Sequence, residues 1–219
     1  MDKLRLRFEK TGRAVYISHL DLMRVMQRVF LRAGCNIKYS EGFNPHAIIS
    51  VCLPLSVGCA SLCELMDFRV EGDADLEAMP EKLTASMPEG IRVTSVYEPE
   101  RKITALKWLK INGRLDYDGR DSAAMLPGLR EFFSRDTLTV TRKTKRGEGE
   151  FDLAPNIFST DFTPEEGFVR LEAIISAQDP TVNPELLIAA LRQSAPELAP
   201  DFAYFTRLEI FDENMNLFR

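Results

Sequence analysis

Two short polar segments hold the chain's only two histidines, His19 within residues 16–24 and His46 within residues 39–46. A histidine beside a scissile phosphate can serve as general acid or base without a metal ion. The hydroxyl, amide and aromatic groups around it can also contact RNA or another ligand. In a structural alternative, His19 only occupies a first helical turn that Ser18 caps. The three roles stay open.

Three arginines, Arg24, Arg28 and Arg32, recur every four residues and therefore share one side of the predicted helix. The planar fork of an arginine is suited to gripping phosphates. The alternative is a solvated face, with Asp21 close enough to Arg28 to neutralise it. The candidate binding residues of this region are Tyr16, Ser18, His19, Asp21, Arg24, Arg28, Arg32, Tyr39, Ser40, Gly42, Phe43, Asn44, Pro45 and His46.

The densest basic run is Arg142-Lys143-Thr144-Lys145-Arg146. A basic hairpin tip can enter an RNA groove or follow a single strand. Glu148 and Glu150 follow at once and reduce the positive charge. Three interpretations of this run are open: it binds nucleic acid, it binds a protein partner, or it is a solvated loop. The candidate residues here are Arg142, Lys143, Lys145 and Arg146.

No metal or cofactor site is expected. The four cysteines are Cys35, Cys52, Cys59 and Cys63. The last two form a C-x3-C pair without the second pair or histidines that structural zinc requires. The glycine patterns of dinucleotide and phosphate loops, the nucleophile elbow and an iron–sulfur motif are absent from the sequence.

The elements that must position these groups follow from periodicity. Leu4, Leu6 and Phe8 alternate with charged residues, which predicts a half-buried strand. Ser18, with Asp21 three residues on, predicts a helix start, and Gly34 predicts its end. A second strand is predicted to start over 37–39 and to resume over 48–55 after the loop, further strands are predicted over 64–70 and 91–97, and a second helix is predicted over 74–87. The order is β-α-β-β-α-β.

The same order returns after a linker over 99–102. Strands are predicted over 106–115, 137–142, 168–176 and 202–211, and helices over 122–133 and 183–193; residues 143–166 sort into no clear element. This order is typical of the ferredoxin-like arrangement, an antiparallel sheet with two helices on one face. We predict an α+β fold of two tandem ferredoxin-like units, residues 1–98 and 104–219.

Net charge and hydropathy limit the classes of ligand and the cellular compartment that we expect for this protein. The net charge of −5 argues against a uniformly basic nucleic-acid binder. Its sign alternates, positive over residues 1–50 and 101–150 and negative over 51–100 and 151–219, as a repeated chain would show. No apolar run is long enough to span a bilayer, and the first residues lack the apolar core of a signal peptide. We expect a cytoplasmic protein that does not contact membranes.

Three runs of residues carry a family resemblance. They are Tyr-Ile-Ser-His-Leu-Asp-Leu-Met-Arg (16–24), Tyr-Ser-Glu-Gly-Phe-Asn-Pro-His (39–46) and Leu-Pro-Leu-Ser-Val-Gly (53–58). Together they resemble the radical SAM-linked domain family, whose function is unknown. The match is specific over roughly residues 4–70, and a later basic segment of the family is similar to residues 145–153, with Ala154 where an arginine is expected.

The resemblance implies a radical SAM enzyme as partner and a setting near RNA processing or the ribosome, but no known reaction. We therefore expect a non-catalytic accessory protein that binds RNA or a ribosomal component. One alternative is a metal-independent endoribonuclease that uses His19 or His46. Another is a protein–protein adaptor without RNA contact.

Overall fold

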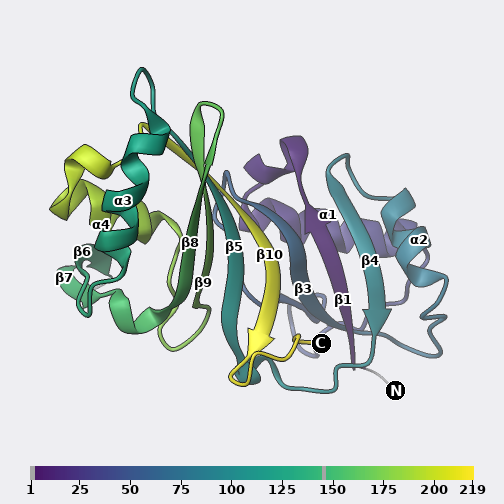
Figure 1. Ribbon diagram of the computed structural model, residues 1–219. Helices are drawn as coiled ribbons and strands as arrows, with labels where there is room; N and C mark the ends of the chain where they lie inside the picture. Colours follow the sequence, from purple (N-terminus) through teal and green to yellow (C-terminus); the bar gives the residue numbers. More distant parts are fainter. Residues whose placement is uncertain (1–2, 145–146) are drawn as a thin grey trace. The chain divides into compact units, whose positions relative to one another are not determined.

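The computed structural model describes residues 3–144 and 147–219 (Figure 1). The fold is mixed α+β, with four α-helices in the described residues and antiparallel pairing between the strands within each unit. The chain divides into two compact units. The first runs to Ile103 and takes in Arg219, and the second is Thr104–Phe218.

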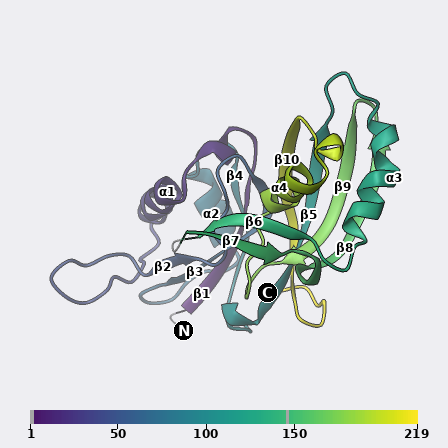
Figure 2. The ribbon, with the colours of Figure 1, turned by 90° about the vertical axis from the view of Figure 1, so that its left-hand side faces the viewer.

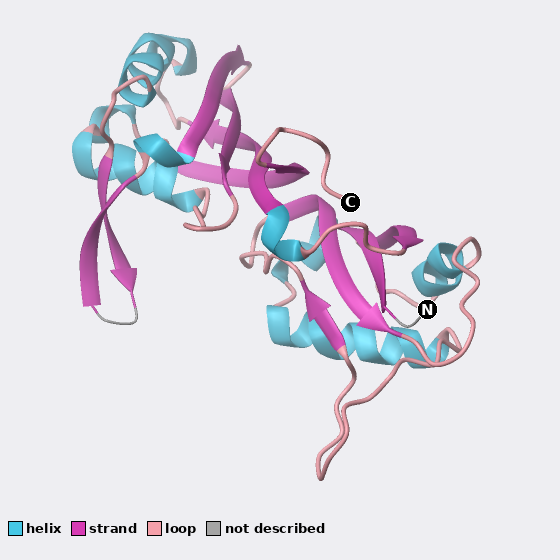
Figure 3. Cartoon of the chain, turned by 90° about the horizontal axis from the view of Figure 1, so that it is seen from below, coloured by secondary structure: helices cyan, strands magenta, loops and turns pink. Residues whose placement is uncertain are grey.

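The first unit has the predicted element order. It comprises β1 (Lys3–Lys10), a 3-10 helix (Gly12–Tyr16), α1 (His19–Arg32), β2 (Ile49–Val51), β3 (Ala60–Arg69), α2 (Met79–Ala85) and β4 (Ile91–Tyr97). Strands pair in the order β4-β1-β3-β2. Both helices lie on one face of this sheet (Figures 1 and 3).

The core of the first unit lies between that face and the helices. Because side chains alternate along a strand, Leu4, Leu6 and Phe8 all point into this core. Phe30 of α1 packs on Phe68 of β3 with ring centroids 4.8 Å apart. The remaining positions of β1, among them Lys3, Arg5 and Arg7, therefore belong to the opposite, helix-free face.

Three predicted segments of this unit are shorter in the structure. The helix expected over 74–87 begins only at Met79, because the Asp75 carboxylate accepts a hydrogen bond from the Ala78 amide at 3.0 Å and holds a turn before it. The strand expected over 48–55 is reduced to β2. The strand expected over 37–39 is reduced to isolated bridges, Ile37 with Val70 and Tyr39 with Ala47.

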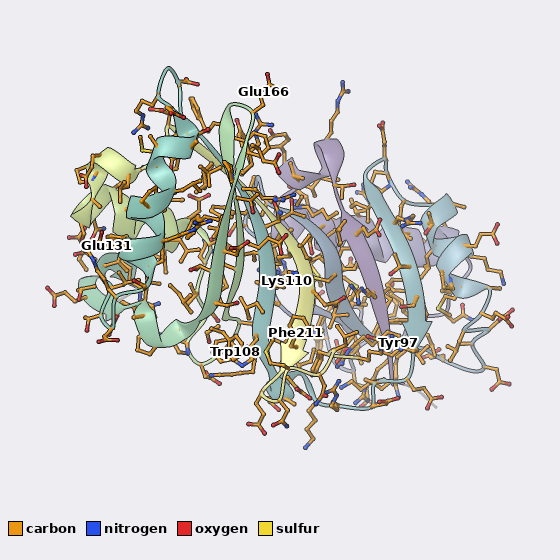
Figure 4. All side chains as sticks on the ribbon, viewed as in Figure 1. Tyr97, Trp108, Lys110, Glu131, Glu166 and Phe211 are labelled. Atoms are coloured by element: carbon orange, nitrogen blue, oxygen red, sulfur yellow. The ribbon has the colours of Figure 1, made fainter. Side chains whose placement is uncertain are left out.

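The second unit contains β5 (Leu106–Asp116), α3 (Ser122–Phe133), β6 (Thr139–Thr144), β7 (Gly147–Asp152), β8 (Ile157–Glu165), β9 (Phe168–Ser176), α4 (Glu185–Ser194) and β10 (Phe202–Asp212). Its sheet has the order β10-β5-β9-β8. The predicted helix over 122–133 and strand over 168–176 are confirmed to the residue. Trp108, near the start of β5 (Figure 4), contacts Phe158 edge to face at 5.4 Å.

The position in the sheet that we predicted for the strand over 137–142 is wrong. We expected it in the sheet, but β6 pairs with β7 in a separate hairpin, and β8 takes the sheet edge beside β9 (Figure 3). The side-chain amide of Gln193 in α4 explains why β6 lies apart from the sheet. It accepts from the Thr141 amide at 2.8 Å and donates to the Thr141 carbonyl at 3.1 Å, so α4 holds the outer edge of β6.

Candidate functional site

A buried lysine anchors the segment before α1. Lys10 is 1% exposed, and its Nζ donates to the carbonyls of Val15 at 3.2 Å and Ile17 at 2.9 Å. These bonds fix the backbone on both sides of Tyr16, whose side chain remains 72% exposed. Tyr16 is therefore presented to solvent by a rigid segment.

The predicted helix cap at Ser18 is confirmed. The Asp21 amide donates to Ser18 Oγ at 3.2 Å, and Ser18 Oγ donates to the Asp21 carboxylate at 2.8 Å. The same carboxylate pairs with Arg24 at 2.9 Å. The hydrogen bond from Ser18, followed by that from Arg24, lowers the pKa of Asp21. Asp21 thus neutralises Arg24, and the predicted pairing with Arg28 was wrong.

Two of the three arginines on α1 remain available. Arg28 and Arg32 are exposed and make no hydrogen bond or ion pair with the described residues. Leu20 and Leu31, 68% and 78% exposed, flank them on the same face of the helix. His19, the first residue of α1, is exposed and equally without a hydrogen bond in the described part of the chain.

The loop over 39–46 closes on itself at its neck. The Ser40 amide donates to the His46 carbonyl at 2.8 Å, and the His46 amide donates to Ser40 Oγ at 3.1 Å. Ser40 Oγ also lies 2.9 Å from His46 Nδ1. Gly42 has a φ of 117°, which favours glycine at the turn.

The tip of this loop presents polar and aromatic groups to solvent. Phe43 is completely exposed and Tyr39 half exposed, and Asn44 and Pro45 are exposed between Phe43 and His46. Figure 2 shows the loop, in dark blue, projecting away from the body of the first unit. Nothing in the unit's own packing accounts for a fully exposed phenylalanine.

The predicted basic hairpin forms in the second unit as β6–β7. Arg142 lies over the Phe151 ring, 3.9 Å from its centroid, so one cation is held against its own hairpin. Lys145 and Arg146 lie outside the described residues, as does the side chain of Lys143. Glu148 and Glu150 are exposed on β7 and oppose the positive charge.

The candidates of the first unit thus form two groups. One is Ser18, Asp21 and Arg24, with Arg28 and Arg32 further along α1, and the other is Ser40 with His46. In the described chain no hydrogen bond or ion pair joins a member of one group to a member of the other. In the described chain His19 and His46 are therefore not joined by hydrogen bonds, and the hydrogen-bond partner of His46 is Ser40.

Sequence reasoning missed a charged cluster on the helix-free face. Arg5, fully buried, binds the Asp67 carboxylate from Nε at 2.6 Å and from the second guanidinium nitrogen at 3.2 Å. Lys3 reaches the same carboxylate at 3.2 Å, and the Cys52 thiol lies 3.8 Å from it. The alternation of Lys3, Arg5 and Arg7 with Leu4, Leu6 and Phe8 was the available signal.

Burial and charge set the protonation of this cluster. Burial alone would raise the pKa of Asp67, but the hydrogen bond and charge of Arg5, with help from Lys3, hold that pKa below its ordinary value. Burial, followed by the Asp67 charge, raises the pKa of the Cys52 thiol to about 12. The cluster is therefore a carboxylate held by two cations beside a protonated thiol.

The described residues contain neither a cluster of metal ligands nor a helix that could span a membrane. Within residues 3–144 and 147–219, no three histidine, cysteine or acidic side chains gather as metal ligands would. Cys59 and Cys63 are both buried, and all four cysteines are free thiols. In the same residues, no helix combines the length and the apolar character that crossing a membrane demands.

Comparisons with known proteins identify the family alone. No curated protein matches the sequence. A crystal structure of an unknown protein from Galdieria sulphuraria is 9% identical to this chain, with a TM-score of 0.26. The match covers 94% of this chain and 96% of that protein. The acetolactate synthase small subunit from Thermotoga maritima is 12% identical to this chain, with a TM-score of 0.27. That match covers 97% of this chain and 98% of the subunit. Residues 3–184 match a family described as "Uncharacterized protein conserved in bacteria (DUF2344)", and the chain belongs to that family.

Proposed function

We propose that this protein is a non-catalytic RNA-binding accessory protein of a radical SAM enzyme. The observation that carries the RNA part is the exposed face of α1, where Arg28 and Arg32 make no ion pair within the described chain while Arg24 is held by Asp21. Exposed, uncompensated arginines are suited to phosphates, which they bind through a planar fork of donors.

The aromatic residues of the loop over 39–46 supply the second part of the proposed interface. Phe43 is fully exposed and Tyr39 half exposed on a loop whose neck is closed by Ser40 and His46. Stacking of a base on an exposed aromatic ring contributes roughly 1–3 kcal/mol per base. A closed neck reduces the conformational entropy that the loop loses on binding.

The net charge limits the strength of this binding. The chain carries −5 overall, so a general affinity for polyanions is not expected. Binding is local, depends on the arginines of α1, and weakens with salt as counterions are released. The β6–β7 hairpin is a secondary contact in this proposal, because Arg142 is already held over Phe151.

The proposed partner and the proposed duplication of the fold were both first inferred from the sequence. The runs over 16–24, 39–46 and 53–58 resemble the radical SAM-linked domain family, which favours a radical SAM enzyme as partner and RNA or a ribosomal component as the object presented to it.

We also propose that the units are two ferredoxin-like copies. In support, the sheets β4-β1-β3-β2 and β10-β5-β9-β8 have equivalent strand orders if the β6–β7 hairpin is an insertion.

One observation favours a second candidate function, a metal-independent endoribonuclease. Ser40 Oγ, 2.9 Å from His46 Nδ1, fixes the orientation of that ring, as a general acid or base requires. Under this alternative, RNA is cut in the presence of a chelator, and His46→Ala or His19→Ala abolishes the cutting.

Crosslinking in cells tests the RNA proposal. Tagged wild type, Arg28→Ala/Arg32→Ala and the control Lys82→Ala, which removes a cation from α2, are purified after ultraviolet crosslinking, and the bound RNA is sequenced. We expect a defined RNA with wild type and the control and its loss with the double variant. Equal recovery with all three proteins would contradict the proposal. Co-purification of a radical SAM enzyme tests the partner, and a partner without RNA would favour the adaptor.

A further inference from the structure

Two edge strands of the sheets are capped by side chains from the helices. Along β4, the Thr84 hydroxyl of α2 accepts from the Val93 amide at 3.0 Å and donates to the Val93 carbonyl at 3.3 Å. Along β8, Arg130 of α3 donates to the Phe162 carbonyl at 2.8 Å, and Pro164 has no amide to offer. Covered edges of this kind prevent a sheet from pairing with a foreign strand.

The β6–β7 hairpin is capped along one side and open along the other. In an antiparallel ladder, the backbone groups of directly opposite residues point toward each other at one position and outward at the next. The Thr141 amide and carbonyl point outward, since both bind the Gln193 side chain. Glu150 lies directly opposite Thr141, and Glu148 opposite Lys143, so their backbone groups point outward from β7. In the described part of the chain, these outward groups have no hydrogen-bond partner.

The two faces of this open edge differ in their side chains. Glu148 and Glu150 are exposed on one face, and neither forms an ion pair with a described residue. Gly149 and Phe151 alternate with them and therefore belong to the other face, where Arg142 lies over the Phe151 ring. The space over Gly149 is open, because a methyl group in place of its hydrogen would meet no atom within 4 Å.

We propose that the outer edge of β7 binds an extended segment of a partner protein as an added β-strand. Basic side chains of that segment lie against Glu148 and Glu150, and its alternate, β-branched side chains lie over Gly149 and Phe151. In strand addition, main-chain hydrogen bonds supply affinity and alternate side chains supply specificity. The hairpin that carries this edge projects beyond the helices of its own unit (Figure 3).

The charge of this edge disfavours two other occupants. If β7 paired with β7 of a second copy of the chain, Glu148 and Glu150 would face glutamates, and like charges opposite each other destabilise a sheet. The same carboxylates repel the phosphates of a nucleic-acid strand. The proposal concerns other residues than RNA binding by α1 and does not depend on it.

Fluorescence anisotropy with the full chain tests the added strand, with a labelled nine-residue peptide of alternating lysine and valine as the probe. N-methylation removes an amide donor, and successive residues of a strand direct their amides to opposite edges. We expect methylation of one alternate set of amides to weaken binding about ten-fold or more and methylation of the other set to leave it unchanged. No binding of the unmodified peptide, or equal effects of the two sets, would overturn the proposal.

Variants of the protein separate the main-chain contribution from the charge. Glu150→Gln keeps the outward amide and should weaken binding about two- to five-fold. Glu150→Pro also removes that amide, which takes no part in the ladder with β6, and should weaken binding about ten-fold or more. Glu166→Gln, which neutralises another exposed glutamate of the second unit, is the control. Circular dichroism confirms that each variant is folded, and unchanged affinity in a folded Glu150→Pro protein would contradict the proposal.

Two further measurements address the other occupants. A wild-type dimer in sedimentation that Glu150→Pro dissociates would assign the edge to a second copy and overturn the proposal. In Arg28→Ala/Arg32→Ala, peptide affinity should equal that of wild type, and a single-stranded RNA octanucleotide should not displace the peptide. Displacement there would assign the edge to RNA. The peptide experiment and the RNA experiments on α1 therefore fail or succeed separately.

Discussion

The Arg5 guanidinium and the Asp67 carboxylate form a two-bond ion pair across β1 and β3, with Nε 2.6 Å from Oδ1 and the second contact at 3.2 Å. Arg5 is fully buried, and the Asp67 side chain is 13% exposed. A buried guanidinium is tolerated because its charge is compensated, so the pair ties the central strands of the first unit together.

Replacement of Asp67 by Asn leaves the Arg5 charge buried with a neutral partner. Removing one member of a buried pair typically costs about 3–5 kcal/mol, and since Asp67 is partly exposed we expect about 2–3 kcal/mol. Urea unfolding at pH 7 measures this loss. Glu98→Gln is the control, and a loss no larger than in that control would contradict a stabilising pair.

The pH dependence of that loss follows from the lowered pKa of Asp67. A carboxylate whose pKa is lower in the folded state contributes stability above its unfolded pKa of about 3.9 and loses it as the pH falls through the folded value. The difference between wild type and Asp67→Asn should therefore be constant from pH 7 to 5 and shrink below pH 4. A difference that grew on acidification would contradict the assignment.

Cys52 should be inert toward alkylation. Its pKa of about 12 leaves about one thiolate in ten thousand at pH 8, because burial and the Asp67 charge both disfavour the anion. Iodoacetamide treatment of the folded protein followed by peptide mapping should show Cys52 reacting at least a hundred-fold more slowly than free glutathione. Equal rates would show that the thiol is neither buried nor beside an ionised Asp67.

Phe43→Ala separates binding from folding. The ring is fully exposed, so its loss should change the free energy of unfolding by less than about 0.5 kcal/mol. If the ring stacks on a base, affinity for single-stranded RNA should fall by roughly 1–3 kcal/mol. Val57→Ala, which trims another exposed apolar side chain of the same unit, is the control. An unchanged affinity would exclude Phe43 from the interface.

Local signals in the sequence predicted α1 well. Ser18 and Gly34 predicted its two ends, and Leu22, Met26 and Val29, which recur at helical spacing, form its buried face. Phe30 is buried beside them because it packs on Phe68 of β3. The extent of the buried face is therefore decided by the partner sheet as well as by the periodicity of the helix.

Tertiary contacts decided the elements that the sequence did not predict. The segment over 137–142 has the β-propensity of a sheet strand, but Gln193 binds its backbone and β7 completes its pairing. β8 was hidden in a polar stretch because four of its nine residues are exposed at a sheet edge. The pairing of Asp21 with Arg24 at three residues, not with Arg28 at seven, depended on side-chain rotamers that periodicity does not specify.

The proposed function depends most directly on RNA binding by the exposed face of α1. Fluorescence anisotropy with a labelled single-stranded RNA and a labelled hairpin, at several salt concentrations, measures affinity and its logarithmic slope against salt. Wild type should bind at least one RNA with a salt-dependent affinity, and Arg28→Ala/Arg32→Ala should weaken binding and reduce the slope by about 0.7 for each arginine that contacts a phosphate. Arg24→Ala, whose arginine Asp21 already holds, should have a smaller effect. Absence of salt-sensitive binding by wild type up to about 100 µM, the weak limit of non-specific binding, would contradict the account.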